Sequence, residues 1–242
     1  MTRLMVLLLS ALALLVWLAG VNQPLFITLH HALAVVPGVV WRLLSMAGEW
    51  TLVIGVLLLL AARQPALLPR MVALGLAGVL ASIGLKAGFD VLRPPLVLPA
   101  GTVSLLDVLP GNASFPSGHA IAVGVLAGVL MPRRLLPTQL GLALLAALVC
   151  LSRLAIGVHW PLDVLVGAAC GFALAHLAGR VGKSAAPTAL LLQAVKALAL
   201  VLVAVTVWKL GQGRPNEAYV LYNQLTLGLC MAVLLGKTAP AK

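Results

Sequence analysis

Charged side chains are scarce in this chain. Of its 242 residues, 9% are Asp, Glu, Lys or Arg, whereas 62% are hydrophobic. Soluble domains usually carry about a quarter charged residues. The composition therefore excludes an ordinary soluble domain and indicates an integral membrane protein.

Acidic residues and cysteines are also few. The carboxylates at Glu49, Asp90, Asp107, Asp163 and Glu217 form no cluster of the kind that holds magnesium. The cysteines lie inside apolar runs without CxxC spacing, so we interpret them as small buried hydrophobic residues and not as disulfides or metal ligands. They are Cys150, Cys170 and Cys230. We predict a protein that uses no metal ion and no other cofactor.

Long apolar runs make up most of the chain. Eight of them are long enough to cross a bilayer. They fall at roughly 4–20, 48–63, 69–87, 118–132, 138–153, 161–179, 189–209 and 219–236. No A-x-A cleavage pattern follows the first run, so we interpret it as a helix and not as a secretion signal. We predict an all-α polytopic transmembrane bundle, with a six-helix core in residues 1–183 and two further helices in residues 184–242.

The net charge of +11 does not indicate nucleic-acid binding, because Lys and Arg are spread over the short connections between apolar runs. On one side of the membrane fall Arg3, Arg63, Arg70, Arg133, Arg134, Arg180, Lys183, Lys237 and Lys242. On the other fall Arg42, Lys86, Arg93, Arg153, Lys209 and Arg214. The positive-inside rule places the first set in the cytoplasm. All five carboxylates then lie on the outer side.

Most of the reactive polar groups gather in three short stretches on that outer side. These are Lys86–Pro94 (KAGFDVLRP), Phe115–His119 (FPSGH) and Ser152–Asp163 (SRLAIGVHWPLD). Ionisable groups are costly near a bilayer and usually mark a functional site there. The stretches hold three Lys or Arg side chains near a single paired carboxylate, and this excess of positive charge favours a bound anion such as phosphate.

In the first stretch, Lys86 and Arg93 are seven residues apart, a spacing that would place both on one face of a helix ending at Pro94. The alternative is that both cations reach toward lipid headgroups. In the second stretch, Ser117 is predicted to cap the start of a helix. Gly118, which has no side chain, would let an anion approach the backbone amides at this helix start, beside His119. The alternative there is a capped helix that carries one polar residue.

The third stretch is the most specific. His159 and Asp163 are four residues apart, so the carboxylate can bind one imidazole nitrogen and leave the other free as a nucleophile. Arg153 lies across a bend near Gly157, where its guanidinium can bind phosphate oxygens. A histidine with an aspartate and an arginine at these spacings favours phosphoryl transfer over a structural role.

The ordered motifs K-x6-RP, PSGH and SR-x5-H-x3-D resemble those of the type 2 phosphatidic acid phosphatase superfamily, over about residues 1–180. The resemblance implies that His159 attacks phosphorus, that Asp163 orients it, and that His119 protonates the leaving oxygen and later activates water. It also implies that a further set of groups holds the phosphoryl oxygens: Lys86, Arg93, Ser117, Gly118 and Arg153. The run HWPLDVLVG is similar to bacterial members, which implies a bacterial inner membrane and a site facing the periplasm.

We therefore expect a metal-independent membrane phosphatase acting on a lipid phosphate or diphosphate. The resemblance ranks undecaprenyl diphosphate first, then phosphatidylglycerophosphate or phosphatidic acid. One alternative is a phosphotransferase that passes phosphate from undecaprenyl diphosphate to lipid A. Another is a non-catalytic lipid carrier or scaffold. The expected partners are the lipid substrate and the bilayer, with no nucleic acid, and the oligomeric state stays open.

Other features complete the expected layout. Residues 21–48 are expected to form an interfacial or re-entrant segment, and residues 94–116 an outer loop that can cover the site. Small residues at four-residue spacing predict that two helices approach closely. These are Ala120, Gly124 and Gly128 on one helix, and Gly167 and Gly171 on the other. We interpret His30 and His31 as a solvated or interfacial pair and His176 as structural.

Overall fold

The computed structural model describes residues 1–131, 134–181, 184, 188–212 and 217–236. These residues form helices joined by turns and loops, and they contain no β-strand. The predicted all-α fold is therefore confirmed. Five cations of the predicted membrane layout lie outside the described ranges: Arg133, Lys183, Arg214, Lys237 and Lys242.

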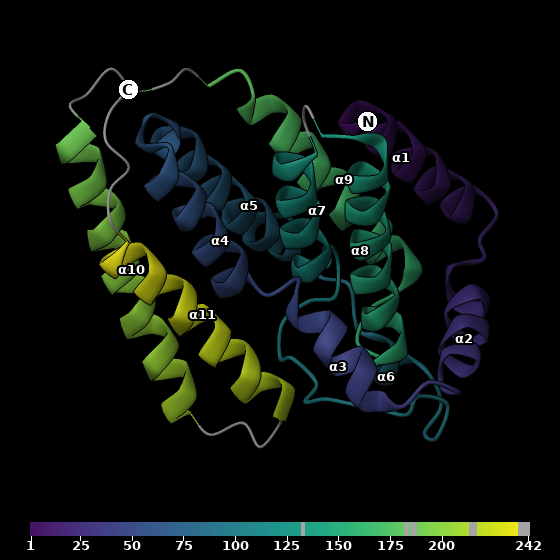
Figure 1. The fold of residues 1–242 in the computed structure, drawn as a ribbon. Helices are drawn as coiled ribbons and strands as arrows, with labels where there is room; N and C mark the ends of the chain where they lie inside the picture. Colours follow the sequence, from purple (N-terminus) through teal and green to yellow (C-terminus); the bar gives the residue numbers. More distant parts are fainter. Residues whose placement is uncertain (132–133, 182–183, 185–187, 213–216, 237–242) are drawn as a thin grey trace. The chain divides into compact units, whose positions relative to one another are not determined.

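Eight helices correspond to the eight predicted apolar runs (Figure 1). They are α1 (Thr2–Leu18), α4 (Trp50–Arg63), α5 (Leu68–Phe89), α7 (Gly118–Leu130), α8 (Leu136–Ala155), α9 (Pro161–Ala178), α10 (Thr188–Gly211) and α11 (Glu217–Leu235). By length and composition, five described helices can cross a membrane, or up to seven spans form if each bent helix pair counts as one. The chain is a multi-pass membrane protein.

Shorter elements occupy the connections. The segment expected to be interfacial contains α2 (Asn22–Leu33) and α3 (Gly38–Met46). Helices α1 and α2 meet at 112°, where Gly20 adopts a positive φ of 65° that suits a residue without Cβ. The 3₁₀-helix η1 (Pro65–Leu67) precedes α5, and α6 (Pro94–Val97) follows it.

The chain forms two compact units. The first comprises residues 1–49 and 77–176, and the second comprises residues 50–76 and 177–242. We predicted a boundary between residues 183 and 184, which separates the six-helix core from the two C-terminal helices. The compact units do not test this boundary, because compactness need not follow such a division, and it stays a prediction. All three reactive stretches belong to the first unit.

Helices α7 and α9 approach each other closely in the first unit. A Cβ added to Gly124 of α7 would lie 2.7 Å from the carbonyl oxygen of Ala168 on α9, and one added to Gly128 would collide with Ala175. A Cβ on Gly167 of α9 would lie 2.7 Å from the carbonyl oxygen of Ser117. The predicted close approach is therefore confirmed, and it brings the start of α7 against the start of α9.

In the second unit, α4, α10 and α11 pack against one another. Gly55 of α4 allows this approach, since a Cβ there would lie 3.3 Å from Leu229 of α11. At one end of the pair α10–α11, the hydroxyl of Tyr219 donates to the carbonyl oxygen of Lys209. The two C-terminal helices therefore form a hairpin that packs on α4.

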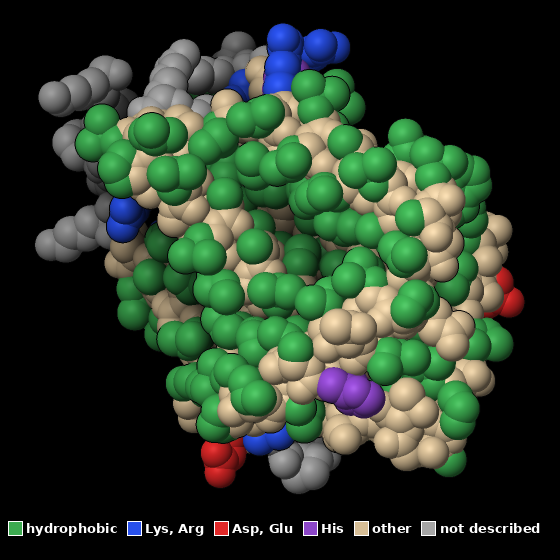
Figure 2. Space-filling model, turned by 90° about the vertical axis from the view of Figure 1, so that its right-hand side faces the viewer, with side chains coloured by type: hydrophobic (Ala, Val, Ile, Leu, Met, Phe, Trp, Pro, Cys, Tyr) green, Lys and Arg blue, Asp and Glu red, His purple; other side chains and the backbone are tan. Residues whose placement is uncertain are grey.

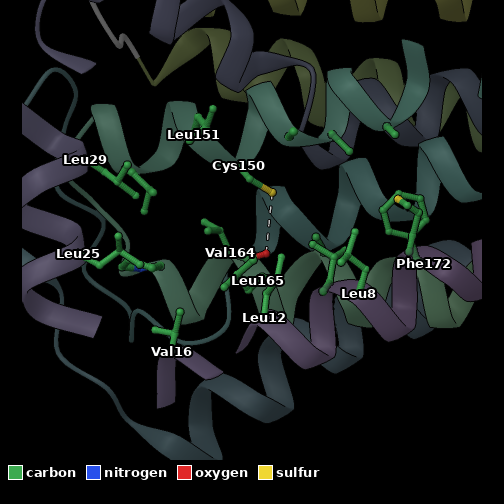
Figure 3. A pocket seen from close by; sticks show the side chains of 18 residues that line it. Leu8, Leu12, Val16, Leu25, Leu29, Cys150, Leu151, Val164, Leu165 and Phe172 are labelled. Atoms are coloured by element: carbon green, nitrogen blue, oxygen red, sulfur yellow. Dashed lines mark hydrogen bonds between the residues drawn. The ribbon is translucent and has the colours of Figure 1, made fainter. Parts of the chain in front are cut away.

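Hydrophobic side chains cover most of the face shown in Figure 2, and the charged side chains lie mainly near its margins. An apolar cavity of about 550 Å³ lies between α1, α2, α8 and α9. Leu8, Leu25, Cys150 and Phe172 point into it from these four helices (Figure 3). None of the three motif cations, and neither motif histidine, lines this cavity.

Candidate active site

The first stretch does not form one continuous helix. Helix α5 ends at Phe89, Asp90 adopts a positive φ of 42°, and Arg93 is the N-cap of α6, which begins at Pro94. The prediction that Lys86 and Arg93 share one helix face was therefore wrong. The prolines start a short helix instead of ending a long one, because proline is well tolerated at the first helical position.

The two cations nevertheless converge on the same loop. The Lys86 ammonium donates to the carbonyl oxygens of Ala113 and Ser114. Arg93 Nε donates to the carbonyl oxygen of Asn112 at 3.0 Å, and its Nη2 donates to Asn112 Oδ1 at 2.7 Å and to the Ala113 carbonyl oxygen at 3.3 Å. Residues 112–114, just before the second motif, thus fix both cations of the first.

The third stretch supplies a buried histidine–aspartate pair. His159 Nδ1 lies 3.2 Å from Asp163 Oδ2, and the two residues are 2% and 1% exposed. The same Oδ2 accepts a hydrogen bond from the backbone N–H of Trp160 at 2.8 Å and another from the Ser114 hydroxyl. Three contacts therefore hold this carboxylate in place.

The other imidazole nitrogen of His159 faces a cation. His159 Nε2 lies 3.4 Å from Arg93 Nη1, which also donates to the Val158 carbonyl oxygen at 2.7 Å. Burial lowers the pKa of His159 well below its ordinary value, and the charges of Arg153, Arg93 and Lys86 lower it further, whereas a hydrogen bond with Ser114 raises it. The ring is therefore neutral at neutral pH, with a lone pair available on one nitrogen.

The second stretch starts α7. Ser117 occupies the N-cap position, but its side chain makes no capping hydrogen bond, contrary to the expected cap. Its backbone N–H instead donates to the carbonyl oxygen of Asp163 at 3.0 Å. The Ser117 hydroxyl is buried and has no partner within the described chain. Gly118 is the first residue of α7, so its amide belongs to the exposed donors at a helix start.

Arg153 reaches the site from the end of α8. It is 5% exposed, its Nη1 donates to the Ser45 hydroxyl on α3, and its Nε has no partner within the described residues. His119 in the first turn of α7 lies 3.6 Å from Glu49, measured from Nε2 to Oε2. Buried donors without acceptors are costly, and an anion beside the cations would give them acceptors.

No group of three or more His, Cys, Asp or Glu side chains within the described ranges could hold a metal ion. All three cysteines are free. The donor set of the site is instead rich in N–H groups and cations, which bind anions and not metals.

Four residues that contact the predicted site were not predicted from the sequence. Ser114 and Asn112 precede the second motif, whereas Ser45 and Glu49 flank the bend between α3 and α4. The motif spacing gives no signal for Ser45 or Glu49, because each contact joins segments far apart in the chain. Polar residues just before FPSGH were the only available signal for the other two.

Other histidines have structural contacts. We interpreted His30 and His31 as a solvated or interfacial pair, and the 4% exposure of His30 excludes the solvated position for that residue. Its Nδ1 donates to the Leu154 carbonyl oxygen, and its Nε2 accepts from the Ser104 N–H. It therefore ties α2 to α8 and to the outer loop. His176 accepts from Arg3 Nε at 3.0 Å, which joins α9 to α1.

Fold and site together define a multi-pass helical membrane protein with a buried histidine–aspartate pair among cations. The family model described as the PAP2 superfamily matches residues 66–184, and this chain belongs to that superfamily.

Three comparisons with individual proteins agree with this assignment. The chain is 43% identical over 67 residues to an undecaprenyl-diphosphatase from Sulfolobus acidocaldarius, a match that covers 26% of this chain and 31% of that protein. It resembles the crystal structure of Aquifex aeolicus LpxE at 28% identity and a TM-score of 0.58, over 66% of this chain and 95% of that one. A transmembrane PAP2-type phosphatidylglycerolphosphate phosphatase from Bacillus subtilis shares the fold, at 21% identity and a TM-score of 0.54, over 74% and 94% of the two chains.

Proposed function

We propose that this protein is a lipid phosphatase that hydrolyses a lipid phosphate or diphosphate through a phosphohistidine on His159. One observation carries the proposal: Nδ1 of this buried ring faces Asp163, and Nε2 faces Arg93. A neutral imidazole held in this way presents a single lone pair beside a cation that attracts phosphate.

In the first step, Nε2 of His159 forms a bond to phosphorus while the bond to the leaving oxygen breaks. Asp163 accepts from Nδ1–H and stabilises the positive charge that develops on the ring. The proton that the leaving oxygen needs comes from His119. Phosphoryl oxygens bind Arg93 and thereby release the Nε2 lone pair, which lies 3.4 Å from Arg93 Nη1.

The remaining donors hold the charge that spreads over the phosphoryl oxygens in the transition state. We assign this role to Lys86, Arg93, Arg153, the Ser117 hydroxyl and the Gly118 amide. The Ser117 hydroxyl and Arg153 Nε support the assignment, since each is buried and has no partner among the residues that the structure describes. In the second step, neutral His119 takes a proton from water, whose oxygen attacks phosphorus, and the P–N bond breaks.

Nothing in this sequence of steps requires a metal ion, because fixed cations supply the positive charge that metals supply in other phosphoryl-transfer enzymes. We therefore propose metal-independent hydrolysis. Two histidines suit it, because imidazole exchanges protons near neutral pH.

Undecaprenyl diphosphate is the substrate that we propose first. Its support is the name of the Sulfolobus acidocaldarius relative, whose match to this chain spans only about a third of that protein. The likeness to the Bacillus subtilis phosphatase concerns the fold alone. Phosphatidylglycerophosphate and phosphatidic acid follow as further lipid phosphates for the same chemistry.

The test is phosphate release by the purified full-length protein in mixed micelles, with undecaprenyl diphosphate, phosphatidylglycerophosphate, phosphatidic acid and a saccharide lipid phosphate as substrates. A parallel reaction adds lipid A to radiolabelled undecaprenyl diphosphate. Free phosphate supports hydrolysis, whereas label on lipid A identifies the phosphotransferase. If the protein binds these lipids but turns over none of them, the result would contradict the proposed phosphatase activity and favour a lipid carrier.

We also propose that the protein lies in a bacterial inner membrane with the site facing the periplasm. The distribution of Lys and Arg over the connections supports the orientation of the site. Single cysteines at exposed Val108, near the site, and at exposed Leu135, at the other end of α8, test it in a protein whose native cysteines are replaced by Ala. A membrane-impermeant maleimide should label only the Val108→Cys protein in intact cells. Labelling of the Leu135→Cys protein alone would reverse the orientation.

A further inference from the structure

A fourth segment, outside the three motifs, packs against the candidate site. It is the α3–α4 corner, which we define as residues 45–49. A Cβ added to Gly48 would lie 2.7 Å from the carbonyl oxygen of His119 and 3.0 Å from its Cβ. Only a residue without a side chain therefore allows the corner to approach the first turn of α7 so closely.

The corner contacts two site residues with its own side chains. Ser45, which is fully buried, accepts a hydrogen bond from Arg153. Glu49 Oε2 lies 3.6 Å from His119 Nε2, and the two side chains are only 20% and 22% exposed. The charge of Glu49 also acts on Arg153. The corner thus carries one contact to a phosphate-binding candidate and one to the candidate general acid.

The surrounding charges make the position of Glu49 significant. The cations of the site are Lys86 on α5, Arg93 at the start of α6 and Arg153 on α8, and each of them disfavours a second positive charge nearby. The carboxylate on α9, Asp163, is engaged by His159, Ser114 and Trp160. Glu49 is the carboxylate that pairs with His119. A carboxylate at this distance favours the protonated imidazole.

We propose that Glu49 is a positioning residue that keeps His119 protonated and oriented for donation to the leaving oxygen. The proposal rests on the proposed function of His119 as general acid. During the reaction Glu49 keeps its charge and transfers no proton. The His119 proton passes to the leaving oxygen as the P–O bond breaks, and the electron pair of that bond stays on oxygen. His119 then regains a proton from the attacking water.

The direct test is the pH dependence of kcat/KM for Glu49→Gln, which keeps the shape of the side chain and removes its charge. The basic limb of the profile should move to lower pH by about one unit, the lower end of the shift that an opposite charge within about 4–6 Å produces. The activity lost at pH 8 should therefore exceed the loss at pH 6 about tenfold. Glu217→Gln, at the start of α11, is the control and should leave the profile unchanged.

A merely structural role predicts a different result. Glu49→Gln would then lose the same fraction of activity at every pH, or would lower the thermal unfolding temperature, and either result without a shifted limb overturns the proposal. Glu49→Asp keeps the charge and should retain the basic limb of the natural protein.

A second measurement separates this proposal from the proposed function. In protein labelled with ¹⁵N-histidine, the His119 signal is assigned by its loss in His119→Gln, and its titration midpoint should fall in Glu49→Gln. A lowered midpoint in a protein that releases no phosphate would contradict the proposed function and support the coupling of Glu49 to His119. An unchanged midpoint would contradict the coupling of Glu49 to His119, whether or not the protein releases phosphate.

Discussion

The Ser114 hydroxyl donates a hydrogen bond to Asp163 Oδ2, the oxygen that also faces Nδ1 of His159. Ser114 Oγ itself lies 3.4 Å from that Nδ1. The backbone of Ser114 is fixed as well, because its N–H donates to the Val91 carbonyl oxygen at 2.7 Å. The loop before the second motif therefore holds the His159–Asp163 pair of the third in its orientation.

Ser114→Ala should lower kcat about 10- to 100-fold, because a hydrogen bond to a charged group contributes about 1.5–3 kcal/mol. Asp163 would keep its bonds to Trp160 and His159, so the loss should be partial, and KM should change less than kcat. Ser104→Ala is the matched control in the same loop, since only the backbone N–H of Ser104 makes a hydrogen bond to His30. Equal losses in both variants would assign the effect to the loop and not to the carboxylate.

His159→Gln should abolish covalent labelling by a radiolabelled lipid phosphate and reduce turnover at least about 1,000-fold, because the nucleophile is lost. Binding of the lipid should persist, since Arg93 and Lys86 remain. The measurements are acid-labile radiolabel on denatured protein and lipid binding in micelles. Normal turnover in this variant would refute the phosphohistidine and favour a carrier.

The lowered pKa of His159 predicts a pH dependence of stability. The unfolded side chain binds a proton below about pH 6.5, whereas the folded one does not until a lower pH is reached. The free energy of unfolding should therefore decrease as pH falls below about 6.5, by at most about 1.4 kcal/mol for each unit that separates the two pKa values. His159→Gln should remove this part of the decrease between pH 6.5 and pH 5, as measured by thermal unfolding in detergent. Parallel curves for the two proteins would contradict a lowered pKa.

Full activity should persist in excess chelator, because arginine and lysine side chains supply the positive charge at the proposed site. The measurement is phosphate release by the purified protein with and without EDTA. Complete loss of activity that magnesium restores would refute metal independence. A partial loss with one lipid substrate alone would point to a metal that the substrate carries.

The positions of the helices could be predicted from the sequence because the bilayer sets their length and composition. Helices α5, α8 and α9 begin and end within a few residues of the predicted apolar runs. The break after Phe89 could not be predicted from the hydrophobic pattern, since Asp90 leaves the helical conformation within a stretch that fits a helix. Lys86 and Arg93, on either side of this break, both contact residues 112–114, and such tertiary contacts can override local helix propensity.

Residue spacing predicted contacts within the candidate site only where these contacts are local. The pairing of His159 with Asp163 follows from a spacing of four residues, and the structure places the two atoms 3.2 Å apart. The contacts of Ser45 with Arg153 and of Glu49 with His119 join segments 108 and 70 residues apart. No local sequence pattern indicates these contacts. The need for a glycine at position 48 is evident only from the packed structure, where a Cβ would lie 2.7 Å from the His119 carbonyl oxygen.

The contact between α7 and α9 should be among the parts of the fold most sensitive to substitution. Gly124→Ala adds a Cβ that would lie 2.7 Å from the Ala168 carbonyl oxygen and 3.1 Å from Gly171 Cα, and backbone atoms cannot move aside cheaply. The variant should lose about 1–3 kcal/mol of stability, and it should also lose activity because α7 and α9 carry His119 and Asp163.

Gly141→Ala on α8 is the matched control, because a Cβ there meets no atom within 4 Å. It should leave the unfolding temperature unchanged or raise it slightly, since alanine favours helix over glycine. Thermal unfolding in detergent, followed by tryptophan fluorescence, compares both variants with the natural protein. Equal unfolding temperatures for the two variants would show that α7 and α9 do not approach as closely as these glycines allow.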